Sequence, residues 1–147
     1  MTNEDYVSYE LAKLLKEKEL SENTICKYAG PNGASEKWYD DYRERMLRFD
    51  WGEGYLFEPL SEPHDQYEIW GDTIPAPTYQ EAMNSLRKKY SLHITIEPYI
   101  TAEGVMYAYK IYKLEQYKVS SLKSKAGFES NESACEDAIK HCLENLI

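Results

Sequence analysis

Residues 92–112 read LHITIEPYITAEGVMYAYKIY, and this stretch decides the fold. Apolar residues alternate with other residues on both sides of a four-residue loop, which is the period of strands with one buried face. With the loop at residues 101–104, the pairs that share a face are Ile94 with Ile111, Ile96 with Tyr109, and Ile100 with Val105. A shift of one residue would separate the apolar sets, so we predict an antiparallel hairpin in this register.

Pro98 lies inside the first strand of this hairpin and has no N–H to donate. Prolines within sheets are confined to edge strands or bulges. We therefore place the first strand at an edge and expect a third strand beside the second. Two segments compete for that third strand, residues 117–122 and residues 125–128.

Helical patterns flank the hairpin on both sides. Thr78 followed by Glu81 forms a capping box, and the apolar face of the helix after it consists of Ala82, Met83, Leu86 and Tyr90. A last helix is expected over residues 131–145 with Ser130 as its N-cap; its apolar stripe consists of Cys135, Ala138, Ile139, Cys142, Leu143 and Leu146.

The order from residue 78 is therefore helix, strand, strand, strand, helix. We predict an α+β fold in two layers, an antiparallel three-stranded sheet with helices on one face. The residues expected to cover the hairpin are Met83, Leu86, Ile139 and Leu143, and those expected on the opposite face are Thr95, Glu97 and Lys110.

An N-terminal helix and short strands precede this unit. The helix should begin between Asn3 and Ser8, with either Thr2 and Asp5 or Ser8 as the cap, and end near Glu19. We expect short strands at residues 24–28 and 46–51 and a hairpin return at residues 55–57, before Pro59 and Pro63 break the pattern. Residues 35–49 also contain a helical spacing that competes with the second strand.

The length of 147 residues is about that of one domain. Residues 71–77 contain two prolines, which disfavour helix in the residues before them. We therefore predict one domain over residues 1–147, with lobes 1–72 and 78–147 as an alternative division and the Pro-rich segment 71–77 as the hinge.

The formal net charge is −9, from 17 Lys and Arg against 26 Asp and Glu. Such a chain repels polyanions, so we expect no nucleic-acid ligand. No apolar run reaches the roughly 18 residues of a membrane span, so no membrane partner is expected either. Residues 1–5 are not followed by the apolar segment of a secretory signal, and we expect a cytoplasmic protein.

Acidic and aromatic residues gather in the middle of the chain, where residues 50–85 contain no Lys or Arg. The aromatic residues that we single out as candidates for binding a partner are Trp51, Tyr55, Tyr67 and Trp70. Alternatively, this segment forms a loop-rich cover over the core with its aromatic residues facing inward, which explains the same composition.

Three cysteines, Cys26, Cys135 and Cys142, make an odd count without a C-x-x-C pair. We predict reduced thiols, with Cys135 and Cys142 on the core face of the last helix. A metal site with the adjacent His141 is disfavoured, because on a helix His141 is rotated by about 100° from Cys142.

No phosphate-binding loop, nucleophile elbow or zinc-protease motif occurs in the chain, and we assign no catalytic residue and no cofactor. His64 and Asp65, with Glu62 and Asp72, form the one cluster of histidine and carboxylates. A small hydrolase or metal-dependent enzyme built on this acidic loop is the alternative from the enzyme class.

Two resemblances add to these inferences. Residues 5–12 (DYVSYELA), 76–83 (APTYQEAM), 86–90 (LRKKY) and 138–143 (AIKHCL) resemble small uncharacterised proteins that recur in phages and conjugative elements of gut bacteroidetes. This resemblance implies an origin on a phage or mobile element and supplies no catalytic residue.

The order from residue 78 also resembles the double-stranded-RNA-binding domain, whose last helix begins with lysines that contact phosphates. Here that helix begins with Asn131 and Glu132, so we expect the ligand to differ.

The function we expect is that of a non-catalytic cytosolic protein that binds a protein partner, with a homo-oligomer as one form of that pairing. A further alternative is an acidic mimic of nucleic acid that inhibits a DNA-binding protein.

Overall fold

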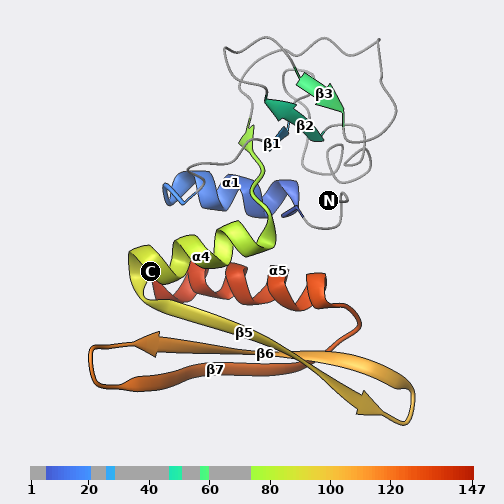
Figure 1. The fold of residues 1–147 in the computed structure, drawn as a ribbon, viewed down its shortest axis with the longest axis vertical. Coiled ribbons are helices and arrows are strands. Elements are labelled where there is room, and N and C mark those ends of the chain that lie inside the picture. The colour runs from blue at the N-terminus through green and yellow to red at the C-terminus, as the bar shows by residue number, and fades with distance from the viewer. Residues whose placement is uncertain (1–5, 21–25, 29–46, 51–56, 60–73) are drawn as a thin grey trace. The chain divides into compact units, whose positions relative to one another are not determined.

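A computed structural model describes residues 6–20, 26–28, 47–50, 57–59 and 74–147 of the chain (Figure 1). The chain forms two compact units, Met1–Thr78 and Tyr79–Ile147. The second unit is described without a gap. Its helices and antiparallel sheet confirm the α+β fold.

Three long strands form the sheet of the second unit. They are β5 (Leu92–Thr101), β6 (Gly104–Leu114) and β7 (Val119–Phe128), in the order β5-β6-β7. The register is the predicted one, with Ile94 opposite Ile111 and Ile96 opposite Tyr109. Pro98 lies in β5, which is an edge strand as predicted.

The third strand is longer than either predicted segment, because β7 is continuous from Val119 to Phe128 and includes part of residues 117–122 and all of residues 125–128. Its pairing with β6 shifts between Tyr107 and Tyr109 and again between Ile111 and Tyr112. Such irregularities interrupt the alternation of faces along a strand. An exposed edge strand with two register shifts therefore leaves no simple apolar period in the sequence.

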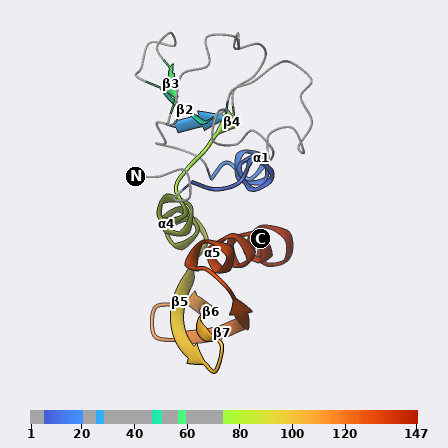
Figure 2. The same cartoon turned by 90° about the vertical axis from the view of Figure 1, so that its right-hand side faces the viewer.

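Two helices cover one face of this sheet (Figure 2). Helix α4 (Tyr79–Tyr90) begins directly after Thr78, where it was predicted to begin. Helix α5 (Asn131–His141) has Ser130 as its N-cap, whose Oγ accepts the N–H of Ser133 at 3.0 Å. The chain then continues as a π-helix, η2 (Cys142–Leu146), so the predicted single helix over residues 131–145 changes its geometry at Cys142.

The core of this unit lies between the helices and the sheet. The buried residues of β5 and β6 are Leu92, Ile94, Tyr109 and Ile111, and those that face them from the helices include Leu86, Ile139 and Leu143. Met83, which we also expected in this layer, is half-buried. Each fully buried Leu or Ile contributes about 1.5–3 kcal/mol relative to an exposed one, so this layer is the main source of the unit's stability.

Helix α1 (Tyr9–Glu17) belongs to the first unit and is capped by Ser8, whose side chain accepts the N–H of Leu11 at 3.2 Å. This decides between the two predicted caps. The predicted apolar residues Val7, Leu11, Leu15 and Leu20 are buried.

Four short strands form the sheet of the first unit in the order β3-β2-β1-β4; they are β1 (Cys26–Tyr28), β2 (Leu47–Asp50), β3 (Phe57–Pro59) and β4 (Ile74–Pro75). The first two lie inside the predicted segments. The return strand occurs later than predicted and includes Pro59, which was expected to break the pattern. Proline is tolerated there because β3 is an edge strand.

Tyr28 ties α1 and β1 together within the first unit. Its hydroxyl donates to the main-chain oxygen of Val7 at 2.7 Å, and its ring lies edge-on to that of Tyr9 at 5.5 Å between centroids. The N–H of Val7 donates to the oxygen of Pro77 at 3.0 Å. Pro77, at the end of the predicted hinge segment, is thereby bonded to the first unit.

Candidate functional site

The residues that the sequence singled out for binding or chemistry lie outside the described part of the chain. This holds for Trp51, Tyr55, Tyr67 and Trp70 and for the loop of His64 and Asp65. The described residues of the second unit instead present two features, a pocket beside α5 that the sequence did not indicate and the sheet face that was predicted to lie opposite the helices.

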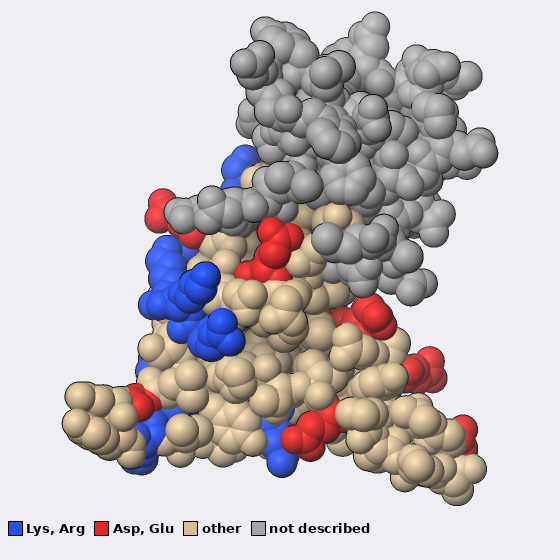
Figure 3. Space-filling view, viewed as in Figure 1, with Lys and Arg blue, Asp and Glu red and all other residues tan. Residues whose placement is uncertain are grey.

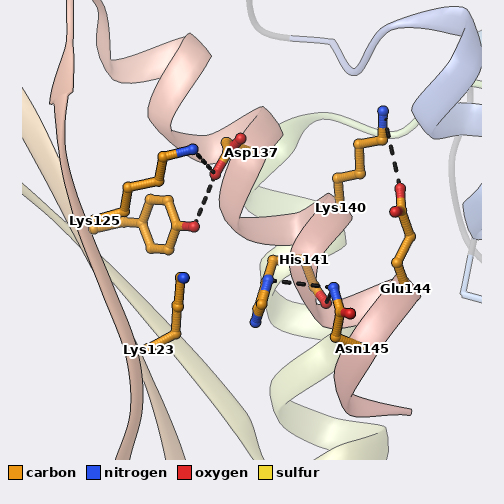
Figure 4. A pocket seen from close by; sticks show the side chains of 8 residues that line it. Lys123, Lys125, Asp137, Lys140, His141, Glu144 and Asn145 are labelled. Atoms are coloured by element: carbon orange, nitrogen blue, oxygen red, sulfur yellow. Dashed lines mark hydrogen bonds and ion pairs between the residues drawn. The ribbon is translucent and has the colours of Figure 1, made fainter.

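The pocket has a volume of about 280 Å³ and lies between β7 and α5 (Figure 4). Its lining combines cationic, anionic and neutral polar side chains from three segments: Tyr109 of β6, Lys123 and Lys125 of β7, and Asp137, Lys140, His141, Glu144 and Asn145 of α5 and η2. Residues four apart on a helix share a face, which brings Asp137, His141 and Asn145 to the same side.

Asp137 is the centre of a small polar network. The Tyr109 hydroxyl donates to Asp137 Oδ2 at 2.8 Å, and Lys125 Nζ lies 3.6 Å from the same oxygen. Burial raises the pKa of Tyr109, and the adjacent Asp137 carboxylate raises this pKa further. Tyr109 therefore stays a neutral hydrogen-bond donor. The charges of Asp137 and Lys125 compensate each other.

The other charged residues of the lining differ in how they are paired. Lys140 Nζ lies 3.9 Å from Glu144 Oε1. Lys123 makes no ion pair and no hydrogen bond with any described side chain. Three lysines against two carboxylates leave the pocket with a surplus of one positive charge in a chain of net charge −9.

From the sequence, a metal site at His141 was disfavoured and this residue received no other role. It is half-buried, and it joins residues that are 16 or more positions away in the chain. The sequence contains two local signals for the lining of this pocket. One is a pair of lysines two apart on a strand, Lys123 and Lys125, and the other is the four-residue spacing of Asp137, His141 and Asn145. Neither indicates a pocket until the pairing of β7 with β6 is known.

Cys135 and Cys142 are buried free thiols on α5 and at the start of η2, as predicted. Burial raises the pKa of Cys135 to about 11 and that of Cys142 to about 12. Such thiols carry almost no thiolate near neutral pH and are poor nucleophiles. Among the described residues, no group of three or more His, Cys, Asp or Glu is placed to hold a metal ion.

The second feature is the sheet face opposite α4 and α5, which we call the open face. By the register of β5 and β6 it contains His93, Thr95, Glu97, Tyr99, Met106, Ala108, Lys110 and Tyr112. The three residues predicted for this face are among them. Leu114 lies on the same face by the alternation along β6. No element of residues 79–147 covers it (Figure 2).

Tyr99 crosses this face, because its hydroxyl accepts the N–H of Gly127 on β7 at 2.9 Å. Gly127 has a φ of +95°, which favours glycine, and lies at one of the register shifts between β6 and β7. Thr95 Oγ1 is buried and has no hydrogen-bond partner. Glu97 and Lys110 make no ion pair with each other or with any other described residue.

Both ends of the sheet carry exposed apolar side chains. Ile100 is 85% exposed at the turn between β5 and β6, and Tyr117 is 91% exposed at the turn between β6 and β7. Basic residues gather elsewhere, at the last turn of α4 with Arg87, Lys88 and Lys89 (Figure 3).

The chain was compared with family models, with curated proteins and with solved structures, and no match was found. None of the helices described is long and apolar enough to cross a membrane.

Proposed function

We propose that this chain is a non-catalytic protein that binds protein through the open face, and that the partner seated there is a second copy of the same chain. The observation that carries the proposal is the apolar and aromatic composition of this face, which no element of residues 79–147 covers. A sheet with a solvated face is common among antiparallel folds, so the composition of this face is what favours a partner.

Apolar and aromatic side chains dominate the open face. Tyr99, Met106, Tyr112 and Leu114 are half-buried in the single chain. Tyrosine and methionine are enriched where proteins bind each other, since they bury a large area with few rotatable bonds or adapt to the partner's shape. Packing of a second layer would remove the remaining exposed area from water.

The charges of the open face favour a second copy over an acidic or basic partner. Glu97 and Lys110 are diagonal neighbours, since Glu97 pairs with Ala108 and Lys110 with Thr95. In a twofold pairing the same patch meets itself, so each Glu97 can approach the Lys110 of the other copy. A face with one charge of each sign suits such a self-complementary contact.

The proposal keeps two expectations from the sequence, a cytoplasmic location and an origin on a phage or mobile element. The resemblance of residues 5–12 and 138–143 supports the origin.

Sedimentation velocity over a wide range of protein concentration tests the proposal with matched charge variants. Lys110→Glu gives each open face two negative charges, so we expect at least about a fivefold weaker dimer, because like charges across an interface are unfavourable. The double variant E97K/K110E restores one charge of each sign and should restore association. Lys118→Glu, in the exposed turn before β7, makes the same charge change away from the face and serves as the control.

A chain that stays monomeric at every concentration contradicts the proposal. Equal weakening by Lys110→Glu and Lys118→Glu also contradicts it, because net charge rather than the open face would then govern association. Thermal unfolding of all variants at low concentration separates a loss of pairing from a loss of folding.

A further inference from the structure

The ammonium of Lys123 and the imidazole of His141 line the same pocket between β7 and α5, and neither forms an ion pair with a described residue (Figure 4). Lys123 Nζ can only donate hydrogen bonds. An anion needs donors, so the site favours an anion if His141 also donates toward the pocket. This depends on which nitrogen of the His141 ring carries the proton.

The contact with Asn145 favours one tautomer of the neutral ring. Its Nδ2 lies 3.3 Å from the main-chain oxygen of His141 and 3.3 Å from His141 Nδ1. A carbonyl oxygen only accepts, so the amide nitrogen of Asn145 is the atom that faces both groups. Nδ1 then accepts from Asn145, and the neutral ring carries its proton on Nε2, which makes Nε2 a donor.

The negative charge of the neighbouring Asp137 does not cancel this preference. Asp137 Oδ2 already accepts from the Tyr109 hydroxyl and lies 3.6 Å from Lys125 Nζ. Glu144 lies 3.9 Å from Lys140 Nζ. Lys123 is the lysine of the lining without a described partner, and its charge is the surplus of the pocket.

We propose that this pocket binds the phosphate group of a small molecule, with Lys123 Nζ and His141 Nε2 as the donors. The two donors of the lining come from a strand and a helix, and so approach a ligand from two sides. A tetrahedral phosphate offers oxygens in diverging directions and accepts from both sides at once. Lysine is also a common phosphate ligand as a point charge.

The size of the pocket indicates what accompanies the phosphate. A volume of about 280 Å³ is near the lower end of the roughly 300–1,000 Å³ of small-molecule sites. It exceeds what one phosphate ion fills, and Glu144 Oε2 and Asn145 Oδ1 remain as polar lining for hydroxyl groups. A phosphomonoester of a small polyol fits this lining better than inorganic phosphate.

Amide NMR titration of the full chain tests the site with three probes: inorganic phosphate, glycerol 3-phosphate and acetate. We expect saturable shifts at β7 and α5 with both phosphates, with tighter binding of the ester, and no saturation with acetate. Lys123→Gln and His141→Phe should each weaken binding about tenfold or more, as expected for loss of a hydrogen bond to a charged group. Lys118→Gln removes the same charge from an exposed turn and should leave binding unchanged.

Absence of saturable binding by either phosphate overturns the proposal. So does equal weakening by Lys123→Gln and Lys118→Gln, which would indicate general attraction to the surface. Saturation by inorganic phosphate with no gain from the ester keeps the phosphate site and refutes the polyol. A thermal melt of each variant shows whether the fold persists, and Lys110→Glu, on the opposite face, should bind the probes like the wild type.

Discussion

The Tyr109 hydroxyl donates a hydrogen bond to Asp137 Oδ2 at 2.8 Å and so joins the central strand of the sheet to α5. The ring of Tyr109 is buried in the core, while its hydroxyl reaches the pocket lining. One side chain therefore contributes to the packing of the core and fixes the carboxylate that compensates Lys125.

Tyr109→Phe should lower the free energy of unfolding by about 1–3 kcal/mol, because the partly buried Asp137 loses its neutral donor while the ring stays packed. Urea denaturation measures the change. Tyr107→Phe, two residues earlier on the same strand and half-buried, is the matched control and should change stability by less than about 0.5 kcal/mol. Equal effects at the two positions would show that the bond to Asp137 is unimportant.

The buried thiols predict a loss of stability in alkaline solution. The pKa values of Cys135 and Cys142 are raised in the folded chain from 9.0 to about 11 and about 12. Above pH 9 the unfolded chain loses these protons first, so the stability they contribute is full below pH 9 and falls as pH rises. Between the pKa of a thiol in the unfolded chain and its pKa in the folded chain, that thiol should lower the free energy of unfolding by about 1.4 kcal/mol for each pH unit.

Cys142→Ala isolates this effect from other groups that titrate in base. Between pH 9 and pH 10, the free energy of unfolding should fall by about 1 kcal/mol less in this variant than in the wild type. Denaturant titration under reducing conditions measures both values. Parallel curves for the two proteins would mean that Cys142 is not protected from water.

Thiol labelling tests the same burial near neutral pH. In a Cys26→Ser variant, which leaves Cys135 and Cys142 as the two thiols, an aromatic disulfide reagent should react only at the rate at which the fold opens. Unfolding in denaturant should release both thiols at once. Rapid reaction of either thiol in the native protein would place it at the surface.

Ser130→Ala should destabilise the second unit by about 0.5–2 kcal/mol, since the N–H of Ser133 loses its acceptor at 3.0 Å. Ser124→Ala, on the exposed part of β7, provides the control. Thermal unfolding followed by circular dichroism gives both values. A melt of Ser130→Ala that matches the control would place the start of α5 elsewhere.

The register of β5 and β6 could be predicted residue by residue because, with a period of two, one register buries both apolar sets. The loop is shorter than the predicted four residues, since Thr101 pairs with Gly104 and only Ala102 and Glu103 form the turn. The caps at Ser8 and Ser130 were predictable for a similar reason, since each depends on residues within three positions. Local chemistry was sufficient in these places.

Features that depend on distant segments were not predictable. The limits of β7 follow from pairing with β6 through two register shifts, and the sequence of an exposed edge strand contains little of that information. The pocket brings Tyr109, Lys123 and His141 together only after β6, β7 and α5 are packed. The aromatic residues at 51, 55, 67 and 70 were chosen on composition, and they stay a prediction.

The most direct test of the proposed function is an isotope-filtered NOE experiment on a mixture of labelled and unlabelled full-length chains. At a concentration where the chain is dimeric, we expect NOEs between copies from the side chains of Tyr112 and Met106, and none from Tyr117 at the turn before β7. Intermolecular NOEs confined to Tyr117 and Ile100, or none at all in an associated sample, would contradict pairing through the open face.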